Sequence, residues 1–123
     1  MVIGLGTDLV EIKRIEKSIE KKYFREKIFS EVEISYCESK TNKAESYSAR
    51  FAAKEAFFKA LGTGWRGGMS FNEVEVVNDD LGKPSLNILG KTFEMIKEKN
   101  IKKIHISLSH TKDVAIATVI LES

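Results

Sequence analysis

Residues 50–64 read RFAAKEAFFKALGTG, and this stretch decides how the rest of the chain is arranged. Eight of its first twelve residues are apolar and four of those are alanine, so helix propensity is high throughout. Nothing breaks the helix before Gly62, which stands where helices commonly end in a left-handed residue. At about 100° per residue the apolar positions cover nearly the whole circumference, which is typical of a buried helix. We therefore expect a long central helix inside the protein.

Charged side chains interrupt this apolar surface along two lines. Glu55 and Lys59 lie one turn apart on one side, and Arg50 and Lys54 lie roughly opposite. One interpretation of Glu55 and Lys59 is a surface ion pair worth about 0.3 kcal/mol. The other is a functional pair, because a carboxylate on so apolar a helix is costly unless it meets a cation. A Gly-Thr-Gly turn follows, and its backbone N–H groups could face a phosphate.

A second short motif, Gly6-Thr7-Asp8, lies near the start of the chain. Residues 2–6 are apolar with two glycines and predict a short buried strand, with Asp8 at its end. Asp8 has two interpretations: the N-cap of a following helix, or a metal ligand, because strand ends place carboxylates at the mouth of a site. The two roles are compatible.

Helical spacing continues after this motif. Leu9, Ile12, Ile15 and Ile19 recur at that spacing and predict an amphipathic helix to about Lys22.

A capping box then marks the start of another helix. Ser30 is followed three residues later by Glu33, and the helix is expected to run to about Ser39. After a polar loop, the central helix is expected to start near Ala44.

The second half of the chain has mostly strand patterns. Residues 71–77 have strand composition, residues 78–82 form a hairpin turn, and Pro84 opens a return strand suited to an edge. Residues 91–99 predict a helix. The side chains expected to face inward on it are Phe93, Met95 and Ile96.

The last two strands complete the fold. Ile104, Ile106 and Leu108 alternate with polar residues, which predicts a half-buried strand with His105 on its surface side. Residues 114–121 are apolar on both faces and predict a central strand. The whole order predicts one α+β domain over residues 1–123, with a mainly antiparallel sheet packed against a long buried central helix.

Composition narrows the class of protein. With 123 residues, 42% hydrophobic and 31% charged, the chain has the composition of a soluble globular domain. No apolar run approaches the ~20 residues that span a bilayer, and the N-terminus lacks signal-peptide features. Cys37 is the single cysteine, which excludes an intramolecular disulfide. We expect a cytoplasmic protein that does not bind a membrane.

The charge is informative through its distribution. A net charge of +2 is too small to argue for nucleic acid. Between residues 12 and 27, however, seven basic residues stand against three acidic ones. This patch, which includes Lys13, Arg14 and Lys17, could steer an acidic partner toward the protein, or it could be a solvated helix face.

Two carboxylates beside glycine-rich turns suit Mg²⁺ held together with a phosphate. Magnesium takes one or two carboxylates, several waters and substrate phosphate oxygens, and Asp8 and Glu55 could supply the carboxylates. Lys59 could pair with the same phosphates, and His110, at a strand-to-turn junction, could donate a hydrogen bond to one. Such a set suits phosphoryl-type transfer, which depends mostly on positioning and charge stabilisation.

Three blocks together resemble a known family. The blocks are residues 6–8, residues 50–64 and the SLSHT of residues 107–111. They are similar to holo-acyl-carrier-protein synthase, the short type of 4′-phosphopantetheinyl transferase. They occur in the family's order and the chain length matches, so the resemblance covers essentially the whole sequence.

The resemblance implies a reaction and a set of site residues. The reaction moves 4′-phosphopantetheine from coenzyme A to a serine of acyl carrier protein, releases adenosine 3′,5′-bisphosphate and supports fatty acid biosynthesis. By motif position, the family's magnesium ligands match Asp8 and Glu55, and its phosphate contacts match Lys59 and His110. Its coenzyme A loop matches Gly62, Thr63 and Gly64. The base that activates the serine is left open between Glu55 and a metal-bound water.

The resemblance also implies partners and assembly. Arg14 matches the surface that docks the acidic carrier protein, with Lys13 and Lys17 as neighbours. The family is typically a homotrimer with sites between subunits. Arg50 and Lys54 face away from Glu55, so either they are structural or they serve a neighbour's site, where Arg50 could hold a coenzyme A phosphate.

Two other functions fit parts of the pattern. A non-enzymatic adaptor could bind acidic proteins through the basic patch, but it would leave the carboxylates and the histidine unexplained. A metal-dependent phosphodiesterase usually needs three or more carboxylates or histidines for two metals, and only Asp8, Glu55 and His110 are well placed.

Overall fold

The computed structural model describes residues 1–123, which form strands, α-helices and two short 3₁₀ turns. In chain order the elements are β1 (Val2–Glu11), α1 (Ile12–Ser18), α2 (Lys22–Ile28), α3 (Glu31–Glu38), α4 (Lys43–Ala60), η1 (Phe71–Glu73), β2 (Val74–Asn78), β3 (Pro84–Ile88), α5 (Gly90–Ile96), η2 (Lys97–Lys99), β4 (Lys103–His110) and β5 (Val114–Glu122). None of the helices combines the length and apolar character that crossing a bilayer needs.

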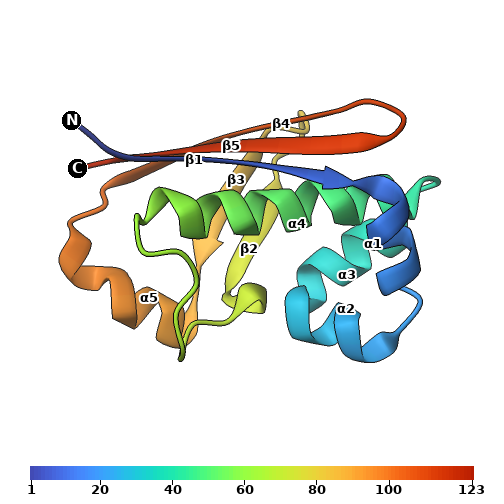
Figure 1. The fold of residues 1–123 in the computed structure, drawn as a ribbon, viewed down its shortest axis with the longest axis horizontal. Coiled ribbons are helices and arrows are strands. Elements are labelled where there is room, and N and C mark those ends of the chain that lie inside the picture. The colour runs from blue at the N-terminus through green and yellow to red at the C-terminus, as the bar shows by residue number, and fades with distance from the viewer.

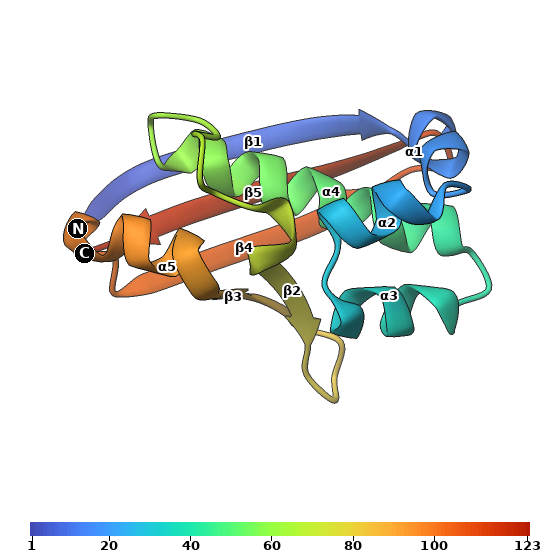
Figure 2. The same cartoon turned by 90° about the horizontal axis from the view of Figure 1, so that it is seen from below.

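The strands form two antiparallel sheets with α4 between them. One sheet has the order β1-β5-β4, and the other is the β2–β3 hairpin. The first sheet runs along one side of α4 and the hairpin lies on the other side (Figure 1). Helices α1 to α3 gather at the N-terminal end of α4 and α5 lies at its C-terminal end (Figures 1 and 2). The predicted α+β class and the central position of β5 are therefore confirmed.

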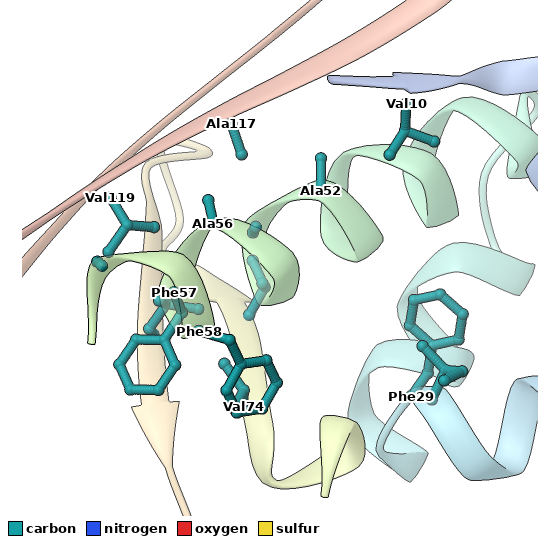
Figure 3. Close-up of a cluster of buried hydrophobic side chains, with 14 of the residues drawn as sticks. Val10, Phe29, Ala52, Ala56, Phe57, Phe58, Val74, Ala117 and Val119 are labelled. Atoms are coloured by element: carbon teal, nitrogen blue, oxygen red, sulfur yellow. The ribbon is translucent and has the colours of Figure 1, made fainter. Parts of the chain in front are cut away.

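The buried central helix is also confirmed. Asn42 caps it by accepting a hydrogen bond from the backbone N–H of Glu45 at 3.2 Å, and Gly62 follows its end with φ at 83°. Ala52 and Ala56 point toward the three-stranded sheet, and larger side chains point away from it (Figure 3). The labelled residues of this core are Val10, Phe29, Ala52, Ala56, Phe57, Phe58, Val74, Ala117 and Val119.

Two glycines of β1 let the strand approach α4 more closely than any other residue would allow. A Cβ placed on Gly6 would lie 2.0 Å from the carbonyl oxygen of Ala56. One placed on Gly4 would lie 2.1 Å from the carbonyl oxygen of Ala60. The backbone of β1 therefore lies directly against the backbone of α4, and this contact sets where the following residues of β1 meet the helix.

The start of the chain differs from the prediction in three ways, the first being that residues 2–6 are mostly exposed rather than buried, because one face of β1 is open to solvent. Strand β1 continues to Glu11, so Asp8 lies within the strand and caps no helix; the N-cap of α1 is Glu11, which makes no side-chain capping bond. Leu9 belongs to the strand and is 59% exposed, and α1 begins only at Ile12. Antiparallel pairing with β5 along this whole length outweighs the helical spacing of the sequence.

The helix near residue 95 has a different inward face from the predicted one. Ile96 is buried as predicted, but Phe93 and Met95 are exposed and Thr92 is buried in their place. The cause is the start of the helix: Glu73 accepts hydrogen bonds from the backbone N–H groups of Lys91 and Thr92, at 3.2 and 3.1 Å. This tertiary cap fixes the rotation of α5 so that positions 92 and 96, one turn apart, face the core.

The capping box is present as predicted. The Ser30 side chain accepts from the backbone N–H of Glu33, and the Glu33 carboxylate accepts from the backbone N–H of Ser30. The hairpin with Pro84 at the start of its return strand is confirmed as well.

A methyl group at Gly6 should force β1 and α4 apart. We expect Gly6→Ala to lower the free energy of unfolding by about 1–3 kcal/mol, as overpacking typically does, measured by urea denaturation. The matched control is Gly67→Ala, because a Cβ at Gly67 meets no atom within 4 Å. Equal stability of the two variants would contradict the close contact.

Candidate active site

Asp8, Thr7 and Lys59 meet where β1 crosses α4. Asp8 follows Gly6 by two residues, so its side chain leaves β1 on the face toward α4. The ammonium nitrogen of Lys59 lies 2.9 Å from Asp8 Oδ1 and donates to the backbone carbonyl of Thr7 at 3.1 Å. The predicted surface pair of Glu55 with Lys59 is therefore replaced by an ion pair between two elements. The Asp8 side chain is 15% exposed and that of Lys59 is 54% exposed, so the pair opens to solvent.

Glu55 lies beside this pair, in surroundings that disfavour the charged form of its carboxyl. Burial raises the pKa of its carboxyl first, and the neighbouring charge of Asp8 raises it further. Lys59 and Arg14 oppose that rise. The hydrogen bond to Asp8 raises the pKa of Lys59 in turn. Two carboxylates thus share a partly buried space, and the charges of Lys59 and Arg14 do not fully offset the rise in the pKa of Glu55.

This arrangement fits a divalent cation whose other ligands include a phosphate. No group of three or more His, Cys, Asp or Glu side chains in the structure is placed to hold a metal. An all-protein metal cage is therefore absent, whereas two hard oxygen ligands suit Mg²⁺, which keeps several waters and binds substrate phosphates. The mutual repulsion of Asp8 and Glu55 is what such a cation would relieve.

The glycine turn lies at the end of α4, just beyond Lys59. Gly62 and Gly64 have φ angles of 83° and 67°, values that only glycine adopts freely. A Cβ at either position would meet no atom within 4 Å, so the turn faces open space. Its backbone can therefore approach a ligand closely, and Thr63 lies between the two glycines.

His110 lies elsewhere in the same chain. Its Nε2 is 3.1 Å from Oε1 of Glu45, in the first turn of α4. Glu45 precedes Glu55 along the helix by about 15 Å at 1.5 Å per residue. The structure therefore does not bring His110 together with Asp8, Glu55 and Lys59 within one chain, and its phosphate contact stays a prediction.

Arg50 is buried on the opposite side of α4. It is 4% exposed, one of its terminal nitrogens donates to Asn78 Oδ1 at 2.5 Å, and its guanidinium lies 4.1 Å from the Tyr36 ring centre. Its Nε has no hydrogen-bond partner. The binding of a coenzyme A phosphate by Arg50 stays a prediction. Lys54 is structural, because it is fully buried against Glu33.

The cations of α1 surround a hollow on the surface. A depression of about 400 Å³ is lined by Arg14, Lys17, Ser18, Lys21, Tyr23 and Phe24. Neither Arg14 nor Lys17 forms an ion pair, and the same holds for Lys13 outside the hollow. Tyr23 is 74% exposed. Tyr23 was not predicted to line a surface hollow, although its position among Lys21, Lys22 and Lys27 is visible in the sequence.

The remaining thiol and histidine are not part of the site. Burial raises the pKa of Cys37 to about 12, which makes it an unreactive thiol. His105 is exposed and lies against Glu122, which agrees with its expected surface position.

Comparisons with known proteins identify the family that the chain resembles. The family described as 4′-phosphopantetheinyl transferase superfamily matches residues 4–119. Proteins named holo-acyl-carrier-protein synthase from Geobacter metallireducens and Syntrophus aciditrophicus are 45% and 48% identical over 124 residues. Those alignments cover 99% of this chain and 98% and 97% of the relatives.

Solved structures with the same name share the fold. The crystal structure from Neisseria meningitidis superposes with a TM-score of 0.91 at 34% identity and covers all of both chains. The Bacillus anthracis protein, solved in complex with CoA (3′,5′-ADP), gives a TM-score of 0.83 at 39% identity and covers 100% of this chain and 98% of its own. The Helicobacter pylori protein, solved in complex with coenzyme A, gives 0.83 at 32% identity, with 96% and 99% covered.

The raised pKa of Glu55 predicts a gain in stability when its charge is removed. The folded protein favours the neutral carboxyl, so ionisation of Glu55 lowers the free energy of unfolding as pH rises from its ordinary pKa through the raised one. In metal-free buffer we expect Glu55→Gln to be more stable than the wild type at pH 7. The difference should disappear at pH 3, where both side chains are neutral.

Thermal unfolding at several pH values tests this. Glu98→Gln is the matched control, because Glu98 is exposed and forms no ion pair. A Glu55→Gln protein less stable than the wild type at pH 7 would contradict the repulsion between Glu55 and Asp8.

Proposed function

The chain belongs to the holo-acyl-carrier-protein synthases of the 4′-phosphopantetheinyl transferase superfamily, and we propose that Asp8, Glu55 and Lys59 form the site where it transfers 4′-phosphopantetheine from coenzyme A to a serine of apo-acyl carrier protein. The products are holo-acyl carrier protein and adenosine 3′,5′-bisphosphate. The observation that carries this assignment is the solvent-open pair of Asp8 and Lys59 beside the half-buried Glu55.

The reaction exchanges the phosphoanhydride bond of the pyrophosphate for a phosphate ester to serine. The serine hydroxyl oxygen attacks the phosphorus that carries the pantetheine arm, and the bond from that phosphorus to the bridging oxygen of the pyrophosphate breaks. The serine proton leaves to a base, and the electron pair of the broken bond stays on adenosine 3′,5′-bisphosphate. The base is either Glu55, whose carboxyl pKa is raised by burial and by Asp8 in the metal-free protein, or a metal-bound water.

Mg²⁺ is the proposed cofactor, held by Asp8 and Glu55. When bound, it would offset negative charge on the pyrophosphate and on the leaving phosphate. Asp8 would then have a second cation near it, which frees the ammonium of Lys59 to pair with a phosphate oxygen. The glycine turn of residues 62–64 follows the C-terminal end of α4, and its own backbone N–H groups would bind the phosphate-bearing part of coenzyme A.

We also propose assembly into a homotrimer with shared sites. The face of the β1-β5-β4 sheet turned away from α4 has no element over it (Figure 1). Exposed apolar side chains lie on that face, with Leu5 at 66%, Leu9 at 59% and Ile116 at 37%. An open apolar sheet face favours association. Asp8 points to the opposite face of β1 from Leu9, but β1 is an edge strand, so a neighbouring subunit on this face could reach the carboxylates around that edge.

Shared sites would give roles to two distant residues. His110 and Arg50 lie too far from Glu55 to contact the same phosphate in one chain. Coenzyme A carries a 3′-phosphate well separated from its pyrophosphate, and Arg50 or His110 of a neighbouring subunit could bind it.

The acidic carrier protein is proposed to dock on α1. The hollow lined by Arg14, Lys17 and Lys21 offers unpaired positive charge next to the exposed ring of Tyr23. The charge of Arg14 reaches Glu55, so this docking surface and the site adjoin. The proposal extends to a role in fatty acid biosynthesis and to the cytoplasm, where a buried free thiol such as Cys37 stays reduced.

Loss of either proposed metal ligand should abolish most of the transfer. We expect Asp8→Asn and Glu55→Gln each to lower the rate about a hundredfold or more, which corresponds to losing about 3 kcal/mol of charge stabilisation. The protein is incubated with coenzyme A, Mg²⁺ and apo-carrier protein, and the carrier's mass is followed. Asp80→Asn, on the exposed hairpin, is the control.

The same assay separates the alternatives. A phosphodiesterase would cleave coenzyme A and leave the carrier unmodified, and an adaptor would do neither. If an Asp8→Asn or Glu55→Gln protein kept the wild-type rate at limiting Mg²⁺, the metal assignment would be wrong.

Charge reversal on α1 should weaken the carrier interaction selectively. We expect Arg14→Glu with Lys17→Glu to raise KM for the carrier protein at least about tenfold at low salt, with KM for coenzyme A within about twofold. The control Lys102→Glu reverses an exposed charge distant from α1. An equal rise in both KM values would move these residues from the docking surface into the coenzyme A site.

Mixing inactive variants tests the shared site. Arg50→Ala and Glu55→Gln subunits are dissociated, mixed and reassembled, with trimer formation followed by analytical ultracentrifugation. We expect part of the activity to return, because some interfaces would pair an intact Arg50 with an intact Glu55. A mixture no more active than either variant, or a monomer in solution, would contradict the proposal.

A further inference from the structure

The residue before Glu55 in the sequence is a buried lysine that the proposed mechanism does not use. Lys54 is fully buried on α4, and its ammonium donates to Glu33 Oε1 at 2.6 Å. It also donates to the backbone carbonyls of Phe71 at 3.0 Å and Val74 at 2.5 Å. All three N–H groups of the ammonium therefore have an acceptor.

Its partner Glu33 is equally buried and equally saturated. Its Oε1 also accepts from the backbone N–H of Ser30, and its Oε2 accepts from the backbone N–H of Val76, both at 2.9 Å. The pair thus joins the N-terminus of α3, the middle of α4, η1 and β2. No other side chain of the structure ties this many elements together through hydrogen bonds.

Stability alone is a weak reason for such a pair. Replacing a buried ion pair by apolar residues of similar size is often neutral or stabilising. An ion pair with fixed hydrogen-bond geometry differs from apolar packing in being directional. A buried directional contact on a helix resists rotation of that helix about its axis.

Rotation of α4 matters because of how the helix is held on its other side. There, Gly4 and Gly6 contact the carbonyls of Ala60 and Ala56, which fixes the distance between β1 and α4. The helix face against the sheet carries small alanine side chains, so the contacts that oppose rotation lie on its other faces, where Phe57, Phe58 and Lys54 are buried. Side-chain atoms lie about 5–6 Å from a helix axis, so a rotation of about 10° moves the Glu55 carboxylate by about 1 Å. A displacement of that size can cost about a hundredfold in rate.

We infer that Lys54 and Glu33 are positioning residues: their buried pair sets the rotation of α4 and thereby places Glu55 and Lys59 opposite Asp8. The orientation of α4 is inferred from the structure alone. The effect of that orientation on coenzyme A binding rests on the proposed function. Lys54 has no exposed surface, so it contacts neither coenzyme A nor the reacting atoms.

The test removes both charges together, since a single removal would leave one buried charge unpaired and could unfold the protein. The double variant Lys54→Met with Glu33→Gln is compared with Ile96→Ala, a core variant on α5 that is destabilised without touching α4's anchor. Calorimetry measures the Mg²⁺-dependent affinity for coenzyme A. A crystal structure of the metal-free double variant measures the orientation of α4.

We expect the double variant to bind coenzyme A with Mg²⁺ at least about tenfold more weakly, with α4 rotated and the 2.9 Å contact between Lys59 and Asp8 lost. Its KM for the carrier protein should stay within about twofold. Ile96→Ala should bind like the wild type. Wild-type affinity in the double variant, an unrotated α4, or equal weakening in Ile96→Ala would overturn the inference.

One further variant separates this inference from the proposed function. If Asp8→Asn in the wild-type background left Mg²⁺-dependent binding unchanged, the metal site would be refuted. The orientation of α4 in the double variant would then still decide the positioning role.

Discussion

The contact between the backbones of β1 and α4 is the constraint on which the rest of the structure depends. It exists because Gly4 and Gly6 lack side chains where the carbonyl oxygens of Ala60 and Ala56 lie. The strand and the helix therefore cross at a distance that no larger residue would permit. Asp8, two residues after Gly6, is brought by this crossing against the side of α4 that carries Lys59.

The candidate site lies where β1 and α4 meet, and not in a pocket. Lys59 is exposed and neutralises Asp8 across the crossing, while Glu55 remains half-buried with its pKa raised. The structure thus holds two carboxylates near one ammonium, a charge pattern that a cation and a phosphate together would balance. The largely apolar hollow of about 380 Å³ beside α5, lined in part by Phe93 and Ile104, lies apart from these residues.

Local patterns in the sequence predicted the elements well and their contacts less well. The central helix and the capping box of Ser30 depend on residues close in sequence, so both could be read directly. Asp8 was misplaced because pairing of β1 with β5, more than a hundred residues away, extends the strand past it. Phe93 was misplaced because Glu73 caps α5 from outside the helix. The motifs drew attention to Glu55 and Lys59, but only the structure shows that Lys59 pairs with Asp8 across two elements.

The most direct test of the account is a crystal structure of the protein grown with coenzyme A and Mn²⁺, which replaces Mg²⁺ and is located by its anomalous scattering. The account predicts one metal bound by a carboxylate oxygen of Asp8 and one of Glu55 at about 2.1 Å, with a pyrophosphate oxygen of coenzyme A and waters as the other ligands and Lys59 turned from Asp8 to a phosphate. A metal bound only by coenzyme A, or a Lys59 that still pairs with Asp8, would contradict it.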